Sequence, residues 1–343
     1  MTAEPIVRQA SSALDILATS RRMLDPRLRA AVDRLPGMLR RIAGYHLGWW
    51  DADERPVAAS PGKAIRPALV LLAAEAVEDR VDEAMPAAVA VELVHNFSLL
   101  HDDVMDVDRM RRNRPTAWTV FGVSQAIIAG DAMASLASAV LSESAGPWAA
   151  SAVRWLNDCV VDLCDGQFLD VAFEQLDRVD LAECLRMVHG KTSALLGVSC
   201  ALGALAGGGT PRQVELLRQF GYHLGLAFQL VDDLLGIWGD PAVTGKPVGA
   251  DLVRRKKSLP VVAALASGTA AGDELARTYR ADTPVDVART SELVELAGGR
   301  KWAETRADEE LAHAMACLDY ANCAPRARGY LVEVANLVVR RNH

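Results

Sequence analysis

The chain has 343 residues, a formal net charge of −7 and 51% hydrophobic residues, with only 5% aromatic residues. The acidic balance argues against nucleic acid as a general partner, and a composition dominated by Ala, Leu and Val with few aromatic residues favours helix over sheet. Six cysteines form no C-x-x-C pair or other zinc spacing, which indicates reduced, mostly buried thiols.

The N-terminal residues contain no hydrophobic signal-peptide segment, so we expect a cytoplasmic protein without a transmembrane segment. We expect one domain over residues 1–343, with residues 1–20 as a flexible arm. The most apolar run, 194–206, is shorter than a membrane span and predicts a buried core helix. Periodicity between Gly and Pro clusters predicts an all-α protein, a single large helical bundle, with helices at 26–47, 64–79, 84–108, 115–141, 147–175, 180–206, 211–238, 251–267, 290–319 and 325–341.

The helix predicted at 84–108 carries three aspartates near its end: Asp102, Asp103 and Asp106. Residues four apart share a helix face, so Asp102 and Asp106 crowd like charges that a cation would stabilise. Mg²⁺ suits this position because it is commonly bound by one or two carboxylates together with substrate phosphates. The arginine-rich stretch 109–115 follows directly, and arginine forks match phosphate oxygens.

A second pair, Asp232 and Asp233, lies in the helix predicted at 211–238. A glycine-containing loop with Lys246 follows it, and then the basic run 254–257. Two such clusters facing each other would clamp a diphosphate. A solvated basic helix end remains the alternative for Arg254, Arg255 and Lys257.

Five segments in register resemble the trans-isoprenyl diphosphate synthases. They are Gly62–Pro67, Glu92–Asp106 with Arg111 and Arg112, Gly166–Asp170, Lys191–Thr192, and Phe228–Asp233 with Gly245, Lys246 and Asp251. The resemblance implies the isoprenoid synthase type of helical bundle with a central active-site cavity. It also implies Mg²⁺-dependent head-to-tail condensation of isopentenyl diphosphate with allylic diphosphates, performed by a homodimer.

The resemblance further implies a role for individual residues. The residues expected to bind isopentenyl diphosphate are Lys63, Arg66, His95 and Arg112. The expected ligands of three Mg²⁺ ions are Asp102, Asp106 and Asp232, supported by Asp103 and Asp233. The expected contacts of the allylic diphosphate are Arg111, Lys191, Thr192, Gln229, Lys246 and Lys256. These aspartates, Lys191 and Lys246 form the expected catalytic set, while Gln167 and Asp170 line the cavity.

Two positions depart from the family pattern. Gly236 replaces the aspartate expected four residues after Asp232, so the second cluster lacks its i+4 carboxylate. Asn113 replaces a glycine after the arginine pair, at a position where asparagine also tolerates positive φ.

Product length in this family depends on the residues that block the tunnel below the first aspartates. Phe97, five positions before Asp102, is the expected floor, followed by the small Ser98. This combination resembles short-chain geranylgeranyl diphosphate synthases, with a twenty-carbon product. The alternatives are a farnesyl or longer-chain synthase, a class I terpene cyclase, or a non-catalytic subunit of a synthase heterodimer.

Several of these residues also have ordinary structural interpretations. His95 alone would fit a core histidine, and Gln167 with Asp170 could brace neighbouring helices. His101 has no assigned role beyond local packing or a supporting hydrogen bond.

Overall fold

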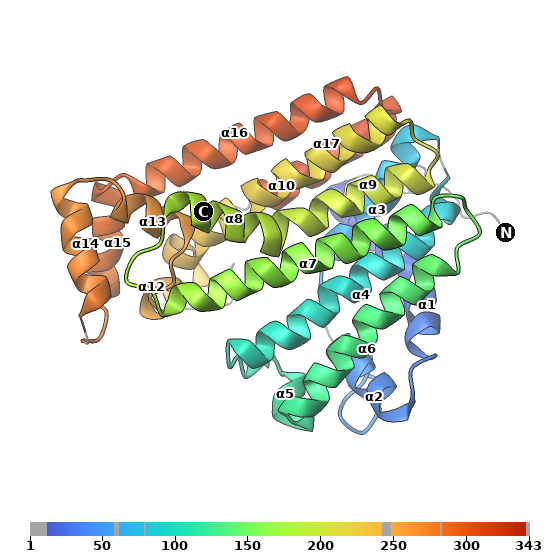
Figure 1. Ribbon diagram of the computed structural model, residues 1–343, viewed down its shortest axis with the longest axis horizontal. Helices are drawn as coiled ribbons and strands as arrows, with labels where there is room; N and C mark the ends of the chain where they lie inside the picture. Colours follow the sequence, from blue (N-terminus) through green and yellow to red (C-terminus); the bar gives the residue numbers. More distant parts are fainter. Residues whose placement is uncertain (1–11, 58–61, 79, 242–247, 282, 341–343) are drawn as a thin grey trace. The chain divides into compact units, whose positions relative to one another are not determined.

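The computed structural model describes residues 12–57, 62–78, 80–241, 248–281 and 283–340 (Figure 1). These residues are overwhelmingly helical, which confirms the all-α prediction. The helices are α1 (Ala13–Val32), α2 (Gly37–His46), α3 (Ile65–Val77), α4 (Val81–Met105), α5 (Ala117–Phe121), α6 (Val123–Ser142), α7 (Ala149–Glu174), α8 (Leu181–Val188), the π-helical turn η2 (His189–Ser193), α9 (Ala194–Ala206), α10 (Pro211–Trp238), α12 (Ala250–Val253), α13 (Leu259–Leu265), α14 (Ala270–Arg280), α15 (Val287–Leu296), α16 (Gly299–Tyr320) and α17 (Pro325–Val339).

The chain divides into two compact units. The first unit comprises Met1–Val160, Val198–Arg218 and Ala321–Val334, and the second comprises Val161–Gly197, Gln219–Tyr320 and Ala335–His343. The first aspartate cluster belongs to the first unit and the second pair to the second unit.

In the first unit, α4 packs against both α3 and α6 (Figure 1). Small and branched side chains of α4, among them Ala87, Ala90 and Leu93, are fully buried. Gly130 allows α6 to approach α4 closely, because a Cβ at this position would lie 2.3 Å from His101 Nε2. His101 Nε2 also lies within hydrogen-bond distance of the Ile127 carbonyl oxygen, at 2.9 Å. This contact gives His101 the local packing role expected from the sequence.

In the second unit, the short helices α12 to α15 pack with the end of α10 around one apolar cluster, and α13 and α15 also contact α16. Its buried members are Ile237, Leu252, Val261, Ala264, Leu275, Tyr279, Leu293, Val294 and Ala297. This cluster fixes the C-terminal end of α10, the helix that carries the second aspartate pair.

The N-terminal prediction was partly wrong. The flexible arm was expected to reach residue 20, but α1 begins at Ala13 and buries Ile16 and Leu17. Ser12 starts the helix, because its side chain accepts a hydrogen bond from the Asp15 N–H. The single helix predicted at 26–47 is also wrong, since residues 33–36, which end in Pro36, separate α1 from α2.

Other boundaries failed where short helices follow one another. Gly122, with φ +99°, separates α5 from α6 inside the range predicted as one helix. The region predicted as 251–267 is divided into α12 and α13, and the sequence analysis missed α14. That helix has local signals: Thr269 caps its start, and Arg277 and Arg280 lie in its last turn.

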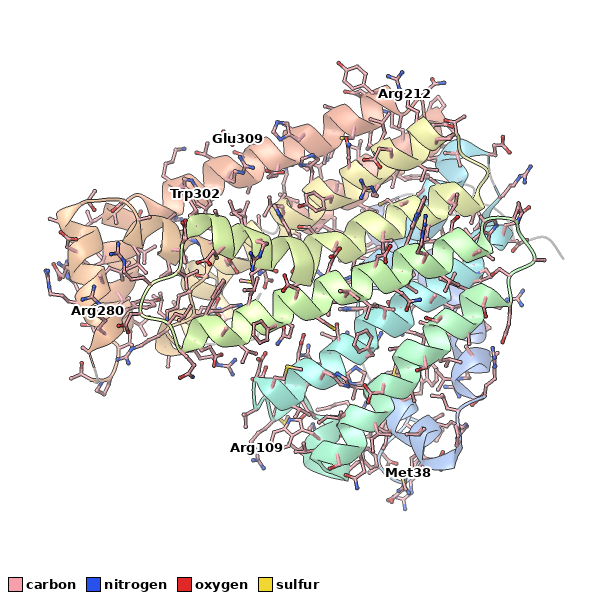
Figure 2. The ribbon with its side chains drawn as sticks, in the orientation of Figure 1. Met38, Arg109, Arg212, Arg280, Trp302 and Glu309 are labelled. Atoms are coloured by element: carbon pink, nitrogen blue, oxygen red, sulfur yellow. The ribbon has the colours of Figure 1, made fainter. Side chains whose placement is uncertain are left out.

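The arginine-rich stretch forms a small hairpin, with β1 (Met110–Arg111) pairing antiparallel to β2 (Arg114–Pro115). Its two turn residues, Arg112 and Asn113, both have positive φ. Such two-residue turns favour asparagine, so the interpretation of Asn113 as tolerant of positive φ is confirmed. Arg109 precedes the hairpin, beyond the end of α4 (Figure 2).

The apolar run 194–206 is helix α9, as predicted, and its residues are almost all buried. Among the described residues, one helix, α6, is long and apolar enough to cross a membrane by length and composition alone. Core helices of other proteins pass the same test, and only 33% of its most apolar window is buried within this chain.

Candidate functional site

The first aspartate cluster lies at the C-terminal end of α4. Asp106 caps the helix, and its backbone N–H donates to the Asp102 carbonyl oxygen at 2.8 Å, so the expected i,i+4 relation is present. Asp106 is exposed and Asp102 is partly exposed. Negative side chains at a helix C-terminus meet the negative end of the helix dipole, which adds to their mutual repulsion. The position therefore favours a bound cation.

Asp103 has a different environment. Its side chain is 1% exposed, and Arg111 Nε donates a hydrogen bond to Oδ1 at 2.7 Å. Burial raises the pKa of Asp103 to about 6, although the Arg111 charge opposes the shift. The Arg111 guanidinium, expected at the allylic diphosphate, is thus held against Asp103 and remains 30% exposed.

A basic cluster in the first unit joins α3 to α4. Arg66 Nη1 lies 3.3 Å from His95 Nε2. Burial and the neighbouring Arg66 and Arg112 charges keep the pKa of His95 well below its usual value, so the neutral ring can accept from the guanidinium. Burial also lowers the pKa of Arg66 to about 10, and Arg66 Nε is inaccessible to solvent without a hydrogen-bond partner among the described residues. Lys63 is exposed, just before α3.

Two residues near this cluster had no role assigned from the sequence: Glu92 and His46. Glu92 is buried on α4, and its Oε1 lies 3.5 Å from Arg21 Nη1. Burial raises the pKa of Glu92, although the charges of Arg21 and Arg66 oppose the shift. His46 lies in α2, and burial together with the charge of Arg111 lowers its pKa to about 3. An acidic residue inside the apolar stretch of α4 was a usable signal for Glu92, whereas nothing local marks His46.

Phe97 and Ser98 are buried on α4 in the first unit. The Phe97 ring is 5% exposed and meets the His101 ring edge to face, with centroids 5.6 Å apart. Ser98 Oγ donates to the His95 carbonyl oxygen at 2.9 Å. The role of Phe97 as a tunnel floor stays a prediction.

In the second unit, Asp232 is exposed on α10 while Asp233 is buried. Asp233 accepts hydrogen bonds from Gln229 Nε2 at 2.9 Å and from the Leu259 backbone N–H at 3.0 Å. Burial raises the pKa of Asp233 to about 6, opposed chiefly by the charge of Lys256. Asp233 therefore holds the start of α13 against α10, and it lies directly beside Asp232 in the sequence.

Lys191 and Asp170 form an ion pair, with Nζ 2.6 Å from Oδ2. Burial alone would raise the pKa of Asp170, but the charges of Lys191 and Lys256 lower it. Burial alone would lower the pKa of Lys256, but the carboxylates of Asp233 and Asp170 raise it. The structure thus brings Lys191, Asp170, Lys256 and Asp233 into one charged cluster in the second unit.

Thr192 and Gln229 are bound to each other, because Thr192 Oγ1 donates to Gln229 Oε1 at 2.9 Å. Lys191 and Thr192 lie on η2, a π-helical turn of the kind often found at functional sites. Helix α7 approaches this turn so closely that position 166 must be glycine, because a Cβ on Gly166 would lie 2.3 Å from the Lys191 backbone nitrogen. Gln167 is buried beside this contact, and Lys246 lies outside the described residues.

The structure explains the missing carboxylate at Gly236. A Cβ at this position would lie 2.1 Å from Asp251 Oδ2. The Asp251 carboxylate of α12 therefore occupies the space beside α10 that a residue-236 side chain would need. The contact between residues 236 and 251 was not predicted, because it joins two separate helices.

Comparisons with known proteins agree with this architecture. Residues 55–297 match the polyprenyl synthetase family. The chain is 48% identical over 330 residues to a geranylgeranyl diphosphate synthase of Mycobacterium tuberculosis, covering 95% of this chain and 93% of the relative. It is 45% identical over 341 residues to a (2E,6E)-farnesyl diphosphate synthase of Mycobacterium bovis, covering 97% and 95%.

Solved structures give the same fold. A polyprenyl synthetase from Streptomyces coelicolor superposes with a TM-score of 0.90 at 46% identity, covering 94% of this chain and 98% of the other. A geranylgeranyl pyrophosphate synthase from Corynebacterium glutamicum, complexed with isoprenyl diphosphate and magnesium, superposes with a TM-score of 0.82 at 26% identity, covering 97% and 100%.

Proposed function

Because the chain belongs to the polyprenyl synthetase family, we propose that it is a transferase that condenses isopentenyl diphosphate with allylic diphosphates. The observation that supports this proposal best is the arrangement of the two aspartate pairs. Asp102 and Asp232 reach solvent. Each is followed by a buried aspartate with a basic side chain nearby, Arg111 at Asp103 and Lys256 at Asp233. This arrangement suits two ligand carboxylates, each held in place by its neighbour.

Isopentenyl diphosphate binds to Lys63, Arg66, His95 and Arg112 in this proposal. The buried Nε of Arg66 has no hydrogen-bond partner among the described residues, which supports the assignment because a diphosphate oxygen would satisfy it. Glu92 offsets the positive charge of Arg21 and Arg66, and so keeps both guanidinium groups in position.

The allylic diphosphate takes Arg111, Lys191, Thr192, Gln229, Lys246 and Lys256 as its contacts. Hard carboxylate oxygens at Asp102, Asp106 and Asp232 fit Mg²⁺, with three ions proposed. When bound, Mg²⁺ stabilises the negative charge that develops on the departing diphosphate. Asp251 supplies the second cluster with the carboxylate that Gly236 lacks. The magnesium in the Corynebacterium glutamicum structure supports this assignment.

The reaction breaks the allylic carbon–oxygen bond and joins the resulting carbocation to the double bond of isopentenyl diphosphate, with loss of a proton. The cationic side chains of Lys191 and Lys256 stabilise the diphosphate leaving group. Apolar residues of the α4 face around Phe97 keep water away from the carbocation.

The product is geranylgeranyl diphosphate in this proposal. The Mycobacterium tuberculosis relative of that name and the Phe97–Ser98 pair on α4 support it. Farnesyl diphosphate is the second candidate, since the farnesyl diphosphate synthase relative is nearly as similar.

We propose a cytoplasmic homodimer. Val123, Ile127 and Ile128 expose apolar side chains along α6, a surface that a second copy of the chain would cover.

Chromatography of the product tests the proposal. Purified protein is incubated with Mg²⁺, labelled isopentenyl diphosphate and dimethylallyl, geranyl or farnesyl diphosphate as primer. A twenty-carbon product from each primer is expected. A fifteen-carbon end product would show that the product is farnesyl diphosphate instead. Release of a hydrocarbon without use of isopentenyl diphosphate would indicate a terpene cyclase.

A further inference from the structure

A second group of metal-ligating side chains lies in the second unit, apart from the aspartates. His223 of α10 meets Glu310 and His313 of α16, and their ligand atoms all lie within 4.8 Å of one another. The sequence analysis gave these residues no role, and the proposed reaction does not use them.

Glu310 is the centre of the group. Its side chain is 2% exposed, and its two oxygens have separate partners. Oε1 pairs with Arg306 one turn earlier on α16, and Oε2 lies 2.6 Å from His223 Nδ1. The carboxylate is therefore held in one orientation, with Oε2 facing the imidazole groups.

His313 completes the group from the surface. It is three residues after Glu310, so both side chains lie on one face of α16. Its ring centroid is 5.3 Å from that of His223, and the residue is exposed. Because the His313 side chain is exposed, rotation about its side-chain bonds can adjust its distance to the other two ligands.

The charge on Glu310 also suits a cation. Burial alone would raise the pKa of this carboxyl, but the hydrogen bond from His223 and the charge of Arg306 hold it below its usual value. The carboxylate is thus ionised at neutral pH although it is buried.

We propose that His223, Glu310 and His313 bind a divalent transition-metal ion such as Zn²⁺ or Co²⁺. Two imidazoles and one carboxylate oxygen are ligands that Zn²⁺ accepts, whereas Mg²⁺ prefers oxygen ligands. The ion displaces the proton shared by His223 and Glu310, and Arg306 stays on the second carboxylate oxygen as an orienting partner.

The geometry requires only a small contraction. Ligand atoms about 2.0–2.2 Å from Zn²⁺ lie roughly 3–3.5 Å apart. Since the three ligand atoms lie within 4.8 Å of one another, no pair needs to approach by more than roughly 1.3–1.8 Å. Water from the exposed side of His313 completes the coordination. The ion would join α10 to α16 within the second unit and so stabilise it against unfolding.

Calorimetric titration with Co²⁺ tests the site in the full-length protein. Saturating Mg²⁺ is present throughout, so that it competes for the carboxylate clusters. The test variant is His313→Ala, an exposed position whose change leaves the core intact. The matched control is Glu309→Gln, an exposed neighbour on the same helix (Figure 2).

The wild type and Glu309→Gln are expected to bind Co²⁺ equally, with paramagnetic broadening of histidine proton resonances. His313→Ala is expected to bind it at least about tenfold more weakly. Equal Co²⁺ binding by wild type and His313→Ala, or no Co²⁺ binding by the wild type, would overturn the proposal. The group would then be only an ion-pair network that braces α10 and α16.

Discussion

Each aspartate pair divides two tasks between neighbouring residues. Asp102 and Asp232 reach solvent, whereas Asp103 and Asp233 are buried and accept hydrogen bonds from within their own unit. A buried carboxylate that lost its partners would be destabilising. The second aspartate of each pair is therefore needed to hold the chain beside the first.

The two groups of basic residues should affect the two substrates differently. Arg66→Ala or His95→Ala is expected to raise the Michaelis constant for isopentenyl diphosphate about tenfold or more, because a charge-assisted hydrogen bond is lost. Lys191→Ala should act mainly on the allylic substrate. Steady-state kinetics with each substrate varied in turn measures the difference, and equal effects on both substrates would rule out this division.

His46 should make the protein sensitive to acid. Its folded pKa of about 3 lies below the ordinary value of 6.5, so the folded state binds fewer protons than the unfolded state. The contribution to stability is present above pH 6.5 and is lost as the pH falls toward 3. His46→Gln should reduce the pH slope of the unfolding free energy by at most about 1.4 kcal/mol per pH unit. Chemical denaturation between pH 7 and 5 measures it, and an unchanged slope would refute the assignment.

The properties of single residues were predictable where they follow from residue type or from position within a helix. They were not predictable where a residue's partners lie on a different helix or loop. The i,i+4 relation of Asp102 and Asp106 follows from helix geometry, and the positive φ of Asn113 follows from residue type. The environment of His46 and the Asp251–Gly236 contact depend on packing between separate elements, which no local pattern encodes. Glu92 did have a local signal, an acidic residue in an apolar stretch, but its partners Arg21 and Arg66 come from other helices.

Among the elements, α4 links most features of the first unit. It carries His95, Phe97 and the first aspartates, and it is fixed by close packing against α6 at His101 and Gly130. Long periodic helices such as α4, α7 and α10 were predicted within a few residues, because their apolar patterns are long. Short helices such as α2, α12 and α14 have weaker patterns, and so their boundaries were wrong or they were missed.

Substitutions at Phe97 and Ser98 on α4 test the predicted product length. Phe97→Ala removes a buried ring five residues before Asp102, so products should lengthen by one or more five-carbon units. Ser98→Phe should shift products toward farnesyl diphosphate, since it adds bulk at a neighbouring buried position. Product chromatography compares both variants with the wild type. An active Phe97→Ala enzyme with an unchanged product distribution would place the floor on another helix.

For the whole molecule, the comparisons confirm the family and the all-α isoprenoid synthase fold that the resemblance implied. Composition and apolar periodicity together predicted the helical class, because both depend on many residues along the chain. The division into two units was not expected. It follows from contacts between distant segments, and α7, α9, α10 and α17 each run through a boundary between the units.

The homodimer is tested at this scale. Light scattering at micromolar concentration should give about twice the chain mass of 36.8 kDa. Ile128→Asp, at a position 55% exposed on α6, should shift the protein toward monomer because a charge would be buried at the interface. Leu296→Asp, at an exposed apolar position on α15, is the matched control and should remain dimeric. A wild-type protein that is only monomeric would contradict the proposal.

We propose that Mg²⁺-dependent condensation requires the aspartates of both units. Its most direct test is the turnover of isopentenyl diphosphate with an allylic primer by wild type, Asp102→Ala and Asp232→Ala at saturating Mg²⁺. The wild type should turn over, stop when Mg²⁺ is chelated and recover when it is restored. Both variants should lose about 100-fold or more in turnover while unfolding like the wild type, because removing a crowded charge does not destabilise the helix. Near-normal turnover by either variant, or by the wild type in chelator, would contradict the claim.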